Sequence, residues 1–461
     1  MSKTFRPYTP GQSYLLPPSP LEWLPEGHLA RFIMDVVSQM DLTAIYRRYE
    51  KDLRGSPPYH PAMMVALLVY AYCVGVPSSR KIEKKTYEDI AFRVIAAEQH
   101  PDHSRISEFR QVHLEALSGL FVQVLQLCQA AGLVKLGHVA LDGTKMKANA
   151  SKHKAMSYER MQKDEQRLQA KVAELLAGAQ KADAEEDESY GKDRHGDELP
   201  EDLRRAKNRL AKIRALKTAL EAEAQQQKEE SEAASRDNGG DDPPPSANSS
   251  PSLPKHKIPV DKQGTPTPKA QRNFTDPESR IMKTGDGYVQ GYNCQAAVDD
   301  AHQIIVAVAV TNQPPDVEHL VPMIDLVIAN CGVAPHNASA DSGYFSGDNV
   351  AALLGRGIDP HIAIGRTKHD ETPPVLDGQP IDSLTPKQKM ARKLATKEGA
   401  AIYSRRKVIA EPPFGQIKEA RGFRQFLMRG LQKVRAEWSL VTLGHNLLKL
   451  HRATRLVVPS G

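Results

Sequence analysis

The feature that most constrains the fold is an alternation of strand and helix patterns between residues 137 and 415. The segment HVALDGTK places alternating apolar side chains before Asp142, and HNASADSG predicts a second short strand that ends at Asp341. PHIAIG predicts a further strand, and helical patterns lie between these strands. Strands interleaved with helices favour an α/β fold built on one sheet.

A hairpin and several helices complete the pattern. Residues 288–298 and 303–311 predict two strands joined by a tight turn at Asp299 and Asp300. Residues 316–330 predict a helix with one apolar face. Further helices are expected to begin near Gly347, Pro386 and Ala436.

Residues 157–230 interrupt the strand pattern. They contain two apolar stripes with heptad-like spacing, separated by the charged segment ADAEEDESYGKDRHGDE. The stripes predict a long helical hairpin inserted after the Asp142 strand, acting as a structural arm or helping self-association. Residues 231–270 are rich in Ser, Asn, Asp and Pro, so we expect them to be disordered.

The N-terminal part, residues 27–134, has a helical pattern throughout. Ser78 and Ser79 predict the cap of one long basic helix, and Ser104 could cap a helix that carries Arg105 and Arg110. A compact helical domain with exposed basic side chains could place a helix in a DNA groove. The same pattern fits a domain that only packs on the rest of the chain or mediates dimers.

The bulk composition excludes several classes of protein. The longest apolar run is too short to span a bilayer, and the N-terminus lacks the apolar core of a secretory signal. The cysteines are scattered and form no CxxC pair, which argues against a disulfide framework or a zinc ribbon. We expect a cytoplasmic, nucleoid-associated protein with no membrane partner.

Positive charge is concentrated near the C-terminus. The chain of 461 residues has a net charge of +6, yet residues 400–461 hold twelve Lys or Arg and only three acidic residues. The remainder of the chain is therefore slightly acidic. A cationic segment of this kind is typical of binding to a phosphate backbone, although a solvated basic surface would look the same.

Within that segment, YSRRKVIAEPPFGQIK spans Tyr403 to Lys418. Pro412 and Pro413 suit the start of a helix, which would put Glu411 at its first turn. Lys418 follows Glu411 by seven residues, so we expect both on one helix face. The alternative interpretation is a capped surface helix in a basic tail.

Three carboxylates that converge from two strand ends and one helix could hold two divalent cations for phosphoryl chemistry. Asp142 by itself equally fits a turn-forming Asp-Gly pair. Glu419 and Glu437 are weaker candidates for the third acid, because each lies further inside a helix. No HExxH, Walker A or GxSxG pattern offers competing chemistry.

Several motifs together resemble the DDE transposases of bacterial insertion sequences, in the group with a Tyr-Arg-Glu-Lys signature. The motifs are HVALDGTKMKANAS, GYVQGYNCQAAVD, ASADSGYFS, MARKLATKEGAAIYSRRK, EPPFGQIKEARGF and EWSLVTLGHNLLKL. The resemblance implies an RNase H-like mixed-sheet catalytic core, with Asp142, Asp341 and Glu411 as the catalytic and metal-binding triad for two Mg²⁺ or Mn²⁺ ions. It also implies that Tyr403 and Lys418 contact DNA.

The signature does not decide which basic residue fills its second position. Arg406 is three residues after Tyr403, as the family pattern expects, whereas Lys407 is four before Glu411. Both are predicted DNA contacts, as are Arg421 and Arg424 of the same cationic segment.

The expected organisation is a DNA-end-binding N-terminal domain (1–135), the first part of the catalytic domain (136–156), the hairpin with its disordered linker (157–272), and the remaining catalytic domain with basic C-terminal helices (273–461). The implied reaction is metal-dependent cleavage followed by strand transfer. Its partners are terminal inverted repeats, target DNA and further copies of the chain in a homodimer or larger synaptic complex. A nuclease or resolvase without strand transfer, and a non-catalytic DNA-binding derivative, are the alternatives.

Overall fold

The structure is a computed structural model, and it describes residues 19–49, 57–190, 201–236, 253–285, 287–365 and 384–457. Its contacts divide the chain into one compact unit of residues 1–123 with 447–461, and a second of residues 124–446. The expected domain boundaries at residues 135, 156 and 272 stay predictions.

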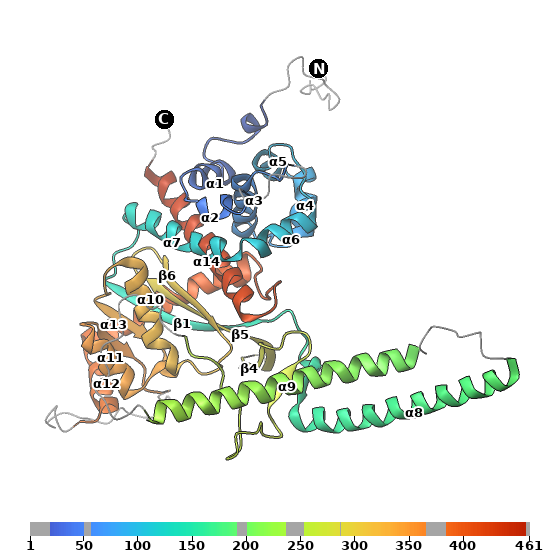
Figure 1. The fold of residues 1–461 in the computed structure, drawn as a ribbon. Helices are drawn as coiled ribbons and strands as arrows, with labels where there is room; N and C mark the ends of the chain where they lie inside the picture. The colour runs from blue at the N-terminus through green and yellow to red at the C-terminus, as the bar shows by residue number, and fades with distance from the viewer. Residues whose placement is uncertain are drawn as a thin grey trace, which may run out of the picture. The chain divides into compact units, whose positions relative to one another are not determined.

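The first unit is helical, as the sequence predicted. After a short 3₁₀ turn (Pro20–Trp23) it contains the helices α1 (Leu29–Ser38), α2 (Thr43–Tyr46), α3 (Pro61–Cys73), α4 (Ser79–Glu88), α5 (Ile90–Ile95) and α6 (His103–Val112), with the start of α7 (Leu114–Ala130) (Figure 1). Pro61 begins α3 at a position where its missing N–H costs no hydrogen bond. Almost every side chain of α3 is buried, so this helix is the core of the unit.

The length of one predicted helix and the cap of another were wrong in this unit, although α4 begins at Ser79 as expected. The basic stretch after Ser78 is two helices, because the Asp89 side chain accepts hydrogen bonds from the first backbone amides of α5 and begins a new helix there. Asp102 caps α6 in place of Ser104. Ser78 remains the N-cap residue of α4 without a side-chain hydrogen bond, so only at α6 does a carboxylate take the place of the predicted serine.

Arg110 has a different role from the one its sequence position indicated. Its guanidinium is buried and donates hydrogen bonds to the Tyr72 hydroxyl (3.2 Å) and the Pro77 carbonyl (2.9 Å). Arg105 is exposed and pairs with Glu108 on its own helix. Arg110 therefore supports the fold of this unit and does not lie on a DNA-facing surface.

The second unit is built on a mixed sheet. Its strands are β1 (His138–Lys147), β4 (Arg280–Thr284), β5 (Gly287–Asp299), β6 (Ile305–Thr311), β7 (Asn337–Ala340) and β8 (Asp359–Ile362). The main order is β4-β5-β1-β7-β8, and β6 also pairs with β5. β1 is antiparallel to β5 and parallel to β7, so helices must connect the parallel half of the sheet.

Strand β1 is longer than predicted. It runs through Asp142 and Gly143 to Lys147, paired with β5 along its whole length, so Asp142 lies within the strand and not at its end. The prediction of a strand ending in Asp was therefore wrong for β1 but confirmed for β7, which ends at Ala340 directly before Asp341.

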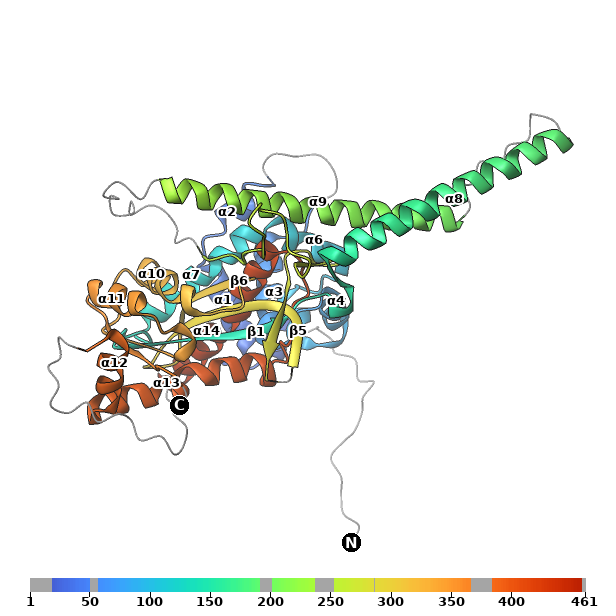
Figure 2. The same cartoon turned by 90° about the horizontal axis from the view of Figure 1, so that it is seen from below.

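Helices cover both sides of this sheet (Figure 2). They are α10 (Leu320–Cys331), α11 (Gly347–Gly355), α12 (Pro386–Ala395), α13 (Lys397–Gly415) and the long α14 (Leu431–Val457). Thr385 forms a capping box with Gln388 and Pro386 follows it, which explains the sharp start of α12. No helix among the described residues is long and apolar enough to cross a membrane.

The proline pair lies inside a helix and does not start one. Pro412 and Pro413 belong to the last turn of α13, so Glu411 lies near the end of that helix. Because Pro412 has no N–H, the carbonyl of Val408 loses its usual partner within the helix. The side-chain amide of Gln303 donates to this carbonyl instead, at 2.8 Å. An outside donor thus lets the helix continue through the prolines.

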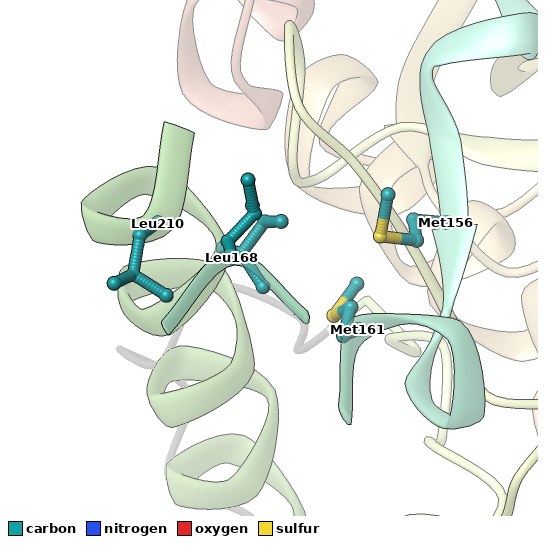
Figure 3. Close-up of a cluster of buried hydrophobic side chains, with 5 residues drawn as sticks. Met156, Met161, Leu168 and Leu210 are labelled. Atoms are coloured by element: carbon teal, nitrogen blue, oxygen red, sulfur yellow. The ribbon is translucent and has the colours of Figure 1, made fainter. Parts of the chain in front are cut away.

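A helical hairpin separates β1 from β4, as the sequence predicted. After β2 (Ala155–Ser157), α8 (Tyr158–Tyr190) and α9 (Glu201–Arg236) lie side by side (Figures 1 and 2). Met156, Met161, Leu168 and Leu210 meet in an apolar cluster at the base of the hairpin (Figure 3). The charged segment predicted as a break spans residues 182–198. The prediction was wrong for its first part, because α8 continues to Tyr190, and residues 191–198 lie outside the described part of the chain.

The expectation of disorder over residues 231–270 was wrong for much of that range. Helix α9 continues to Arg236, and Ile258 and Ala270 are buried with Tyr158 and Leu220 in a second apolar cluster. A few apolar side chains were enough to fold this polar segment onto α9 and into β3 (Gln271–Asn273), which pairs with β2. Residues 237–252 lie outside the described part.

Candidate active site

The register between β1 and β7 brings two of the predicted acids together. His138 pairs with Asn337 and Ala140 with Ser339, in parallel. The same register continued by two residues puts Asp341 beside Asp142. Neighbouring strands lie about 4.8 Å apart, so these carboxylates, which are 199 residues apart in sequence, lie at one edge of the parallel pair.

Backbone amides hold both carboxylates. The N–H of Gly143 donates to Asp142 Oδ1 at 2.8 Å, and the N–H of Gly343 donates to Asp341 Oδ1 at 2.8 Å. Asp341 thereby caps the short 3₁₀ turn Ser342–Tyr344 that follows β7. The Asp-Gly and Asp-Ser-Gly motifs of the sequence are thus local devices that orient each acid.

Helix α13 brings a guanidinium to the first acid. Arg406 is buried, and its Nη1 lies 3.5 Å from Asp142 Oδ2, with the two side chains 10% and 19% exposed. Its Nε and Nη1 find no hydrogen-bond acceptor among the described residues. Burial opposes the charge of Arg406, but Asp142, Tyr403 and Asp341 together raise the pKa of its guanidinium.

The neighbouring residues of α13 face elsewhere. Tyr403 is half-buried and hydrogen-bonds to Arg406, whereas Lys407 is exposed. Adjacent residues of a helix point in different directions, so Arg406 faces Asp142 and Lys407 faces solvent. The sequence alone could not choose between these two residues for the signature position. Glu411 is exposed near the end of the same helix.

The electrostatics of Asp142 link the three predicted acids. Burial raises the pKa of Asp142 to about 6, while Arg406 and the Gly143 amide oppose the rise. The carboxylates of Asp341 and Glu411 raise it further, so both lie within electrostatic range of Asp142. Yet within the described part of the chain no three His, Cys, Asp or Glu side chains gather closely enough to surround one ion.

The Lys418 side chain contacts strand β1, although not in the way that the sequence predicted. Residues 416–420 form a π-helical turn, so the expected seven-residue spacing on one face does not apply. Instead the ammonium of Lys418 donates to the hydroxyl of Thr144, two residues beyond Asp142 on the same face of β1. Burial lowers the pKa of Lys418, and the charge of Asp142 is among those that oppose this.

The last two predicted DNA contacts differ in exposure. Arg421 is buried with its guanidinium over the Phe423 ring, 5.4 Å from the centroid, a position that does not favour direct contact with DNA. Arg424 is exposed and pairs with Glu419. Only Arg424 of this pair lies open to a large ligand.

The alternative third acids have other roles in the structure. Glu437 is fully buried and accepts hydrogen bonds from the backbone amides of Leu427 and Met428. Glu419 is exposed and paired with Arg424. Glu411 is thus the C-terminal acid whose charge acts on Asp142.

A further carboxylate, that of Asp316, was not among the predicted site residues. Its Oδ1 accepts hydrogen bonds from the side-chain amides of Asn293 (2.7 Å) and Gln295 (2.8 Å), and it pairs with Lys145 at 3.1 Å. A Cβ built on Gly143 would lie 3.2 Å from this carboxylate, so Gly143 permits the close approach. Successive residues of a strand face opposite sides, so Asp316 lies on the side of β1 opposite to Asp142.

A similar contact ties Asp316 to the second acid. A Cβ built on Gly343 would lie 3.7 Å from Asp316 Oδ2, and the adjacent Tyr344 donates its hydroxyl to Gln295. Asp316 therefore lies beneath the glycines that orient Asp142 and Asp341. Polar residues at alternating positions of β5, an otherwise buried strand, were the available signal, since buried polar side chains need partners.

Two family models match this chain. A model of the transposase DDE domain matches residues 253–447, and a model of a transposase domain (DUF772) matches residues 18–112. Both matches are to transposase domains, and together they support a DDE transposase of an insertion sequence. The family implies an RNase H-like fold, which the strand order of the transposase fits, and a DNA-binding enzyme.

The matched regions divide the predicted acids unequally. Asp341 and Glu411 lie inside the DDE domain match of the transposase, whereas Asp142 lies before it, beyond the inserted hairpin. No curated protein and no solved structure matches the transposase.

Proposed function

We propose that this transposase cleaves DNA at the ends of an insertion sequence and joins the freed 3′ ends to target DNA. Asp142, Asp341 and Glu411 are its proposed catalytic and metal-binding residues. The observation that carries the proposal is the β1–β7 register, which continues to put Asp341 beside Asp142, together with the effect of Glu411 on the Asp142 pKa.

The donor set fits a hard divalent cation. Carboxylate oxygens are the ligands that Mg²⁺ and Mn²⁺ prefer, and a bound cation reduces the repulsion between clustered carboxylates. The proposed cofactor is two such ions. When bound, they would activate the attacking water or 3′-hydroxyl and stabilise the leaving oxygen of the phosphodiester.

The basic residues around the acids would hold the substrate. Arg406 neutralises Asp142 across 3.5 Å and has unused donors, so its guanidinium is suited to bind a DNA phosphate once the acids are otherwise neutralised. This favours Arg406 over Lys407 for the signature position. Lys418, held by Thr144, and Tyr403, bonded to Arg406, would bind the DNA backbone next to the reacting bond.

Recognition of the ends requires other surfaces. We assign the binding of terminal inverted repeats to the helical N-terminal domain, and we expect at least two copies of the chain in the synaptic complex, because two ends must be joined. The exposed Arg424 would add a further backbone contact.

The test incubates the purified protein with end-bearing duplex, a target plasmid and Mg²⁺, and maps nicks and joints. We expect 3′ nicks at the element end and joints in the plasmid. Asp341→Asn should bind the ends normally and lose both products, whereas Asp348→Asn, an exposed carboxylate on α11, should retain them.

The other outcomes separate the alternatives. Nicks without joints would identify a nuclease, and binding without nicks by the unaltered protein would identify a non-catalytic derivative. Unchanged cleavage by Asp341→Asn would remove this residue from the site.

A further inference from the structure

The base of the helical hairpin carries an open groove with a volume of about 470 Å³. Its lining includes five side chains that carry a full positive charge and no carboxylate. These are Lys154, Arg160, Arg205, Arg209 and Lys212. All five are exposed, so the groove presents concentrated positive charge to solvent.

The cations come from separate elements that the fold brings together. Lys154 ends the 3₁₀ turn Lys152–Lys154, and Arg160 lies in the first turn of α8. Arg205, Arg209 and Lys212 follow one another at spacings of four and three on α9, so they form one stripe. At 1.5 Å per residue this stripe is about 10 Å long, comparable to a few phosphates of a DNA strand.

Basic residues of α9 next to the groove are paired with a carboxylate, whereas several of the basic residues that line the groove are not, in the part of the chain that the structure describes. On the same helix, Arg214 and Lys217 both pair with Glu165 at 2.9 Å. Lys154, Arg160 and Lys212 have no ion-pair partner among the described residues.

The remaining two cations of the groove are only weakly neutralised. Arg209 lies 3.9 Å from Asp164, and Arg205 pairs with the exposed Glu201 one turn away. Three of the five cations thus lie close together without a carboxylate partner in the described part of the chain, and like charges repel, so an external anion would stabilise this arrangement.

The floor of the groove is apolar and packed. It includes Met156 and Phe274, which belong to or pack against the apolar cluster that joins the hairpin to β2 (Figure 3). The backbone segments that carry the cationic side chains are therefore anchored on a packed apolar base.

We propose that this groove is a second DNA-binding surface, which binds the phosphate backbone of duplex DNA away from the acids. The inference rests on the proposed function for the identity of the polyanion, and it gives the inserted hairpin a role beyond that of a structural arm. Contacts of this kind neutralise phosphates without reading sequence, so they would add affinity and salt dependence for any DNA that extends past the cleavage site.

The test measures duplex binding by the full-length protein in EDTA over a range of salt concentrations. The double variant Arg160→Gln with Lys212→Gln should bind about 10-fold more weakly near physiological salt, and the slope of log affinity against log salt should fall by about 1.8 for two lost contacts. The matched control is Lys171→Gln with Arg204→Gln, which removes the same charge from exposed hairpin positions outside the groove. It should change the affinity less than twofold.

A crosslinking experiment gives the proposal a readout that does not depend on net charge. A photoreactive residue in place of Asn208, which lines the groove, should crosslink to duplex DNA, and the same group in place of Arg204 should not. Equal effects of the two double variants, or no crosslink at position 208 with a bound duplex, would overturn the proposal. Cleavage with Mg²⁺ is scored separately, so a failure of the proposed chemistry leaves the binding result readable.

Discussion

The acids on the sheet and the acid on the helix are held in different ways. Asp142 and Asp341 each accept the backbone N–H of a nearby glycine, and the Asp316 carboxylate lies close to both glycines. Glu411 is exposed at the end of a helix that contains consecutive prolines and continues into a π-helical turn. The sheet supplies a rigid pair of carboxylates, whereas the third depends on how α13 is held.

The largest expected effect tests whether the helix acid is as essential as the sheet acids. Glu411→Gln should lower the rate of Mg²⁺-dependent cleavage at least about 1,000-fold, equivalent to about 4 kcal/mol of transition-state stabilisation. Glu419→Gln, eight residues on and exposed, is the matched control and should retain activity. If both variants cleave at equal rates in a single-turnover assay, Glu411 is not part of the site, which then contains only Asp142 and Asp341.

The second test removes the Asp316 carboxylate, which lies close to the glycines next to Asp142 and Asp341. Asp316→Ala leaves Lys145 without its ion pair and the amides of Asn293 and Gln295 without their acceptor, so the free energy of unfolding should fall by about 3 kcal/mol. Asp325→Ala on α10 removes an ion pair with Arg356 that is about one-third exposed, and should cost less than about 1 kcal/mol. Urea denaturation measures both, and a similar loss for the two variants would contradict a special role for Asp316.

The third test uses pH in the metal-free protein. Because the pKa of Asp142 is raised to about 6 from its ordinary value of 3.8, the folded state binds more protons than the unfolded state between those values. Stability contributed by this group should therefore fall as the pH rises from about 4 to about 6 and stay level above, by up to about 3 kcal/mol.

The control for the pH test is Asp142→Asn, which cannot titrate. The difference in unfolding free energy between the unaltered protein and this variant should show the decline. A difference that is flat over pH 4 to 7 would mean that Asp142 is not held in a buried, negatively charged setting.

The smallest effect concerns the outside support of α13. Gln303→Ala removes the hydrogen bond to the Val408 carbonyl and should cost about 1 kcal/mol of stability. Its neighbour His302, which is exposed, supplies the control variant His302→Ala. Hydrogen exchange should speed up in the last turns of α13 for Gln303→Ala alone. Faster exchange across β1 as well would show that the two regions are not held independently.

Local pattern predicted much of this molecule. The strand ending at Asp341, the hairpin around Asp299 and the helix opened by Pro386 each depend on a few adjacent residues, and all appear where expected. Some errors were local, as at the Asp102 cap, and others arose where a tertiary contact overrode a local signal. Pro412 would ordinarily end or start a helix, but Gln303, more than a hundred residues away in sequence, satisfies the carbonyl it leaves open.

The sequence by itself determined that Asp142 and Asp341 would lie in or directly after strands, since the alternation of side chains is a property of neighbouring residues. The tertiary structure alone decided which groups meet. It set Arg406 and not Lys407 against Asp142, buried Arg110 and Arg421, and brought Asp316 under Gly143. Those outcomes depend on strand register and helical phase, which are fixed by packing between segments that lie far apart in the chain.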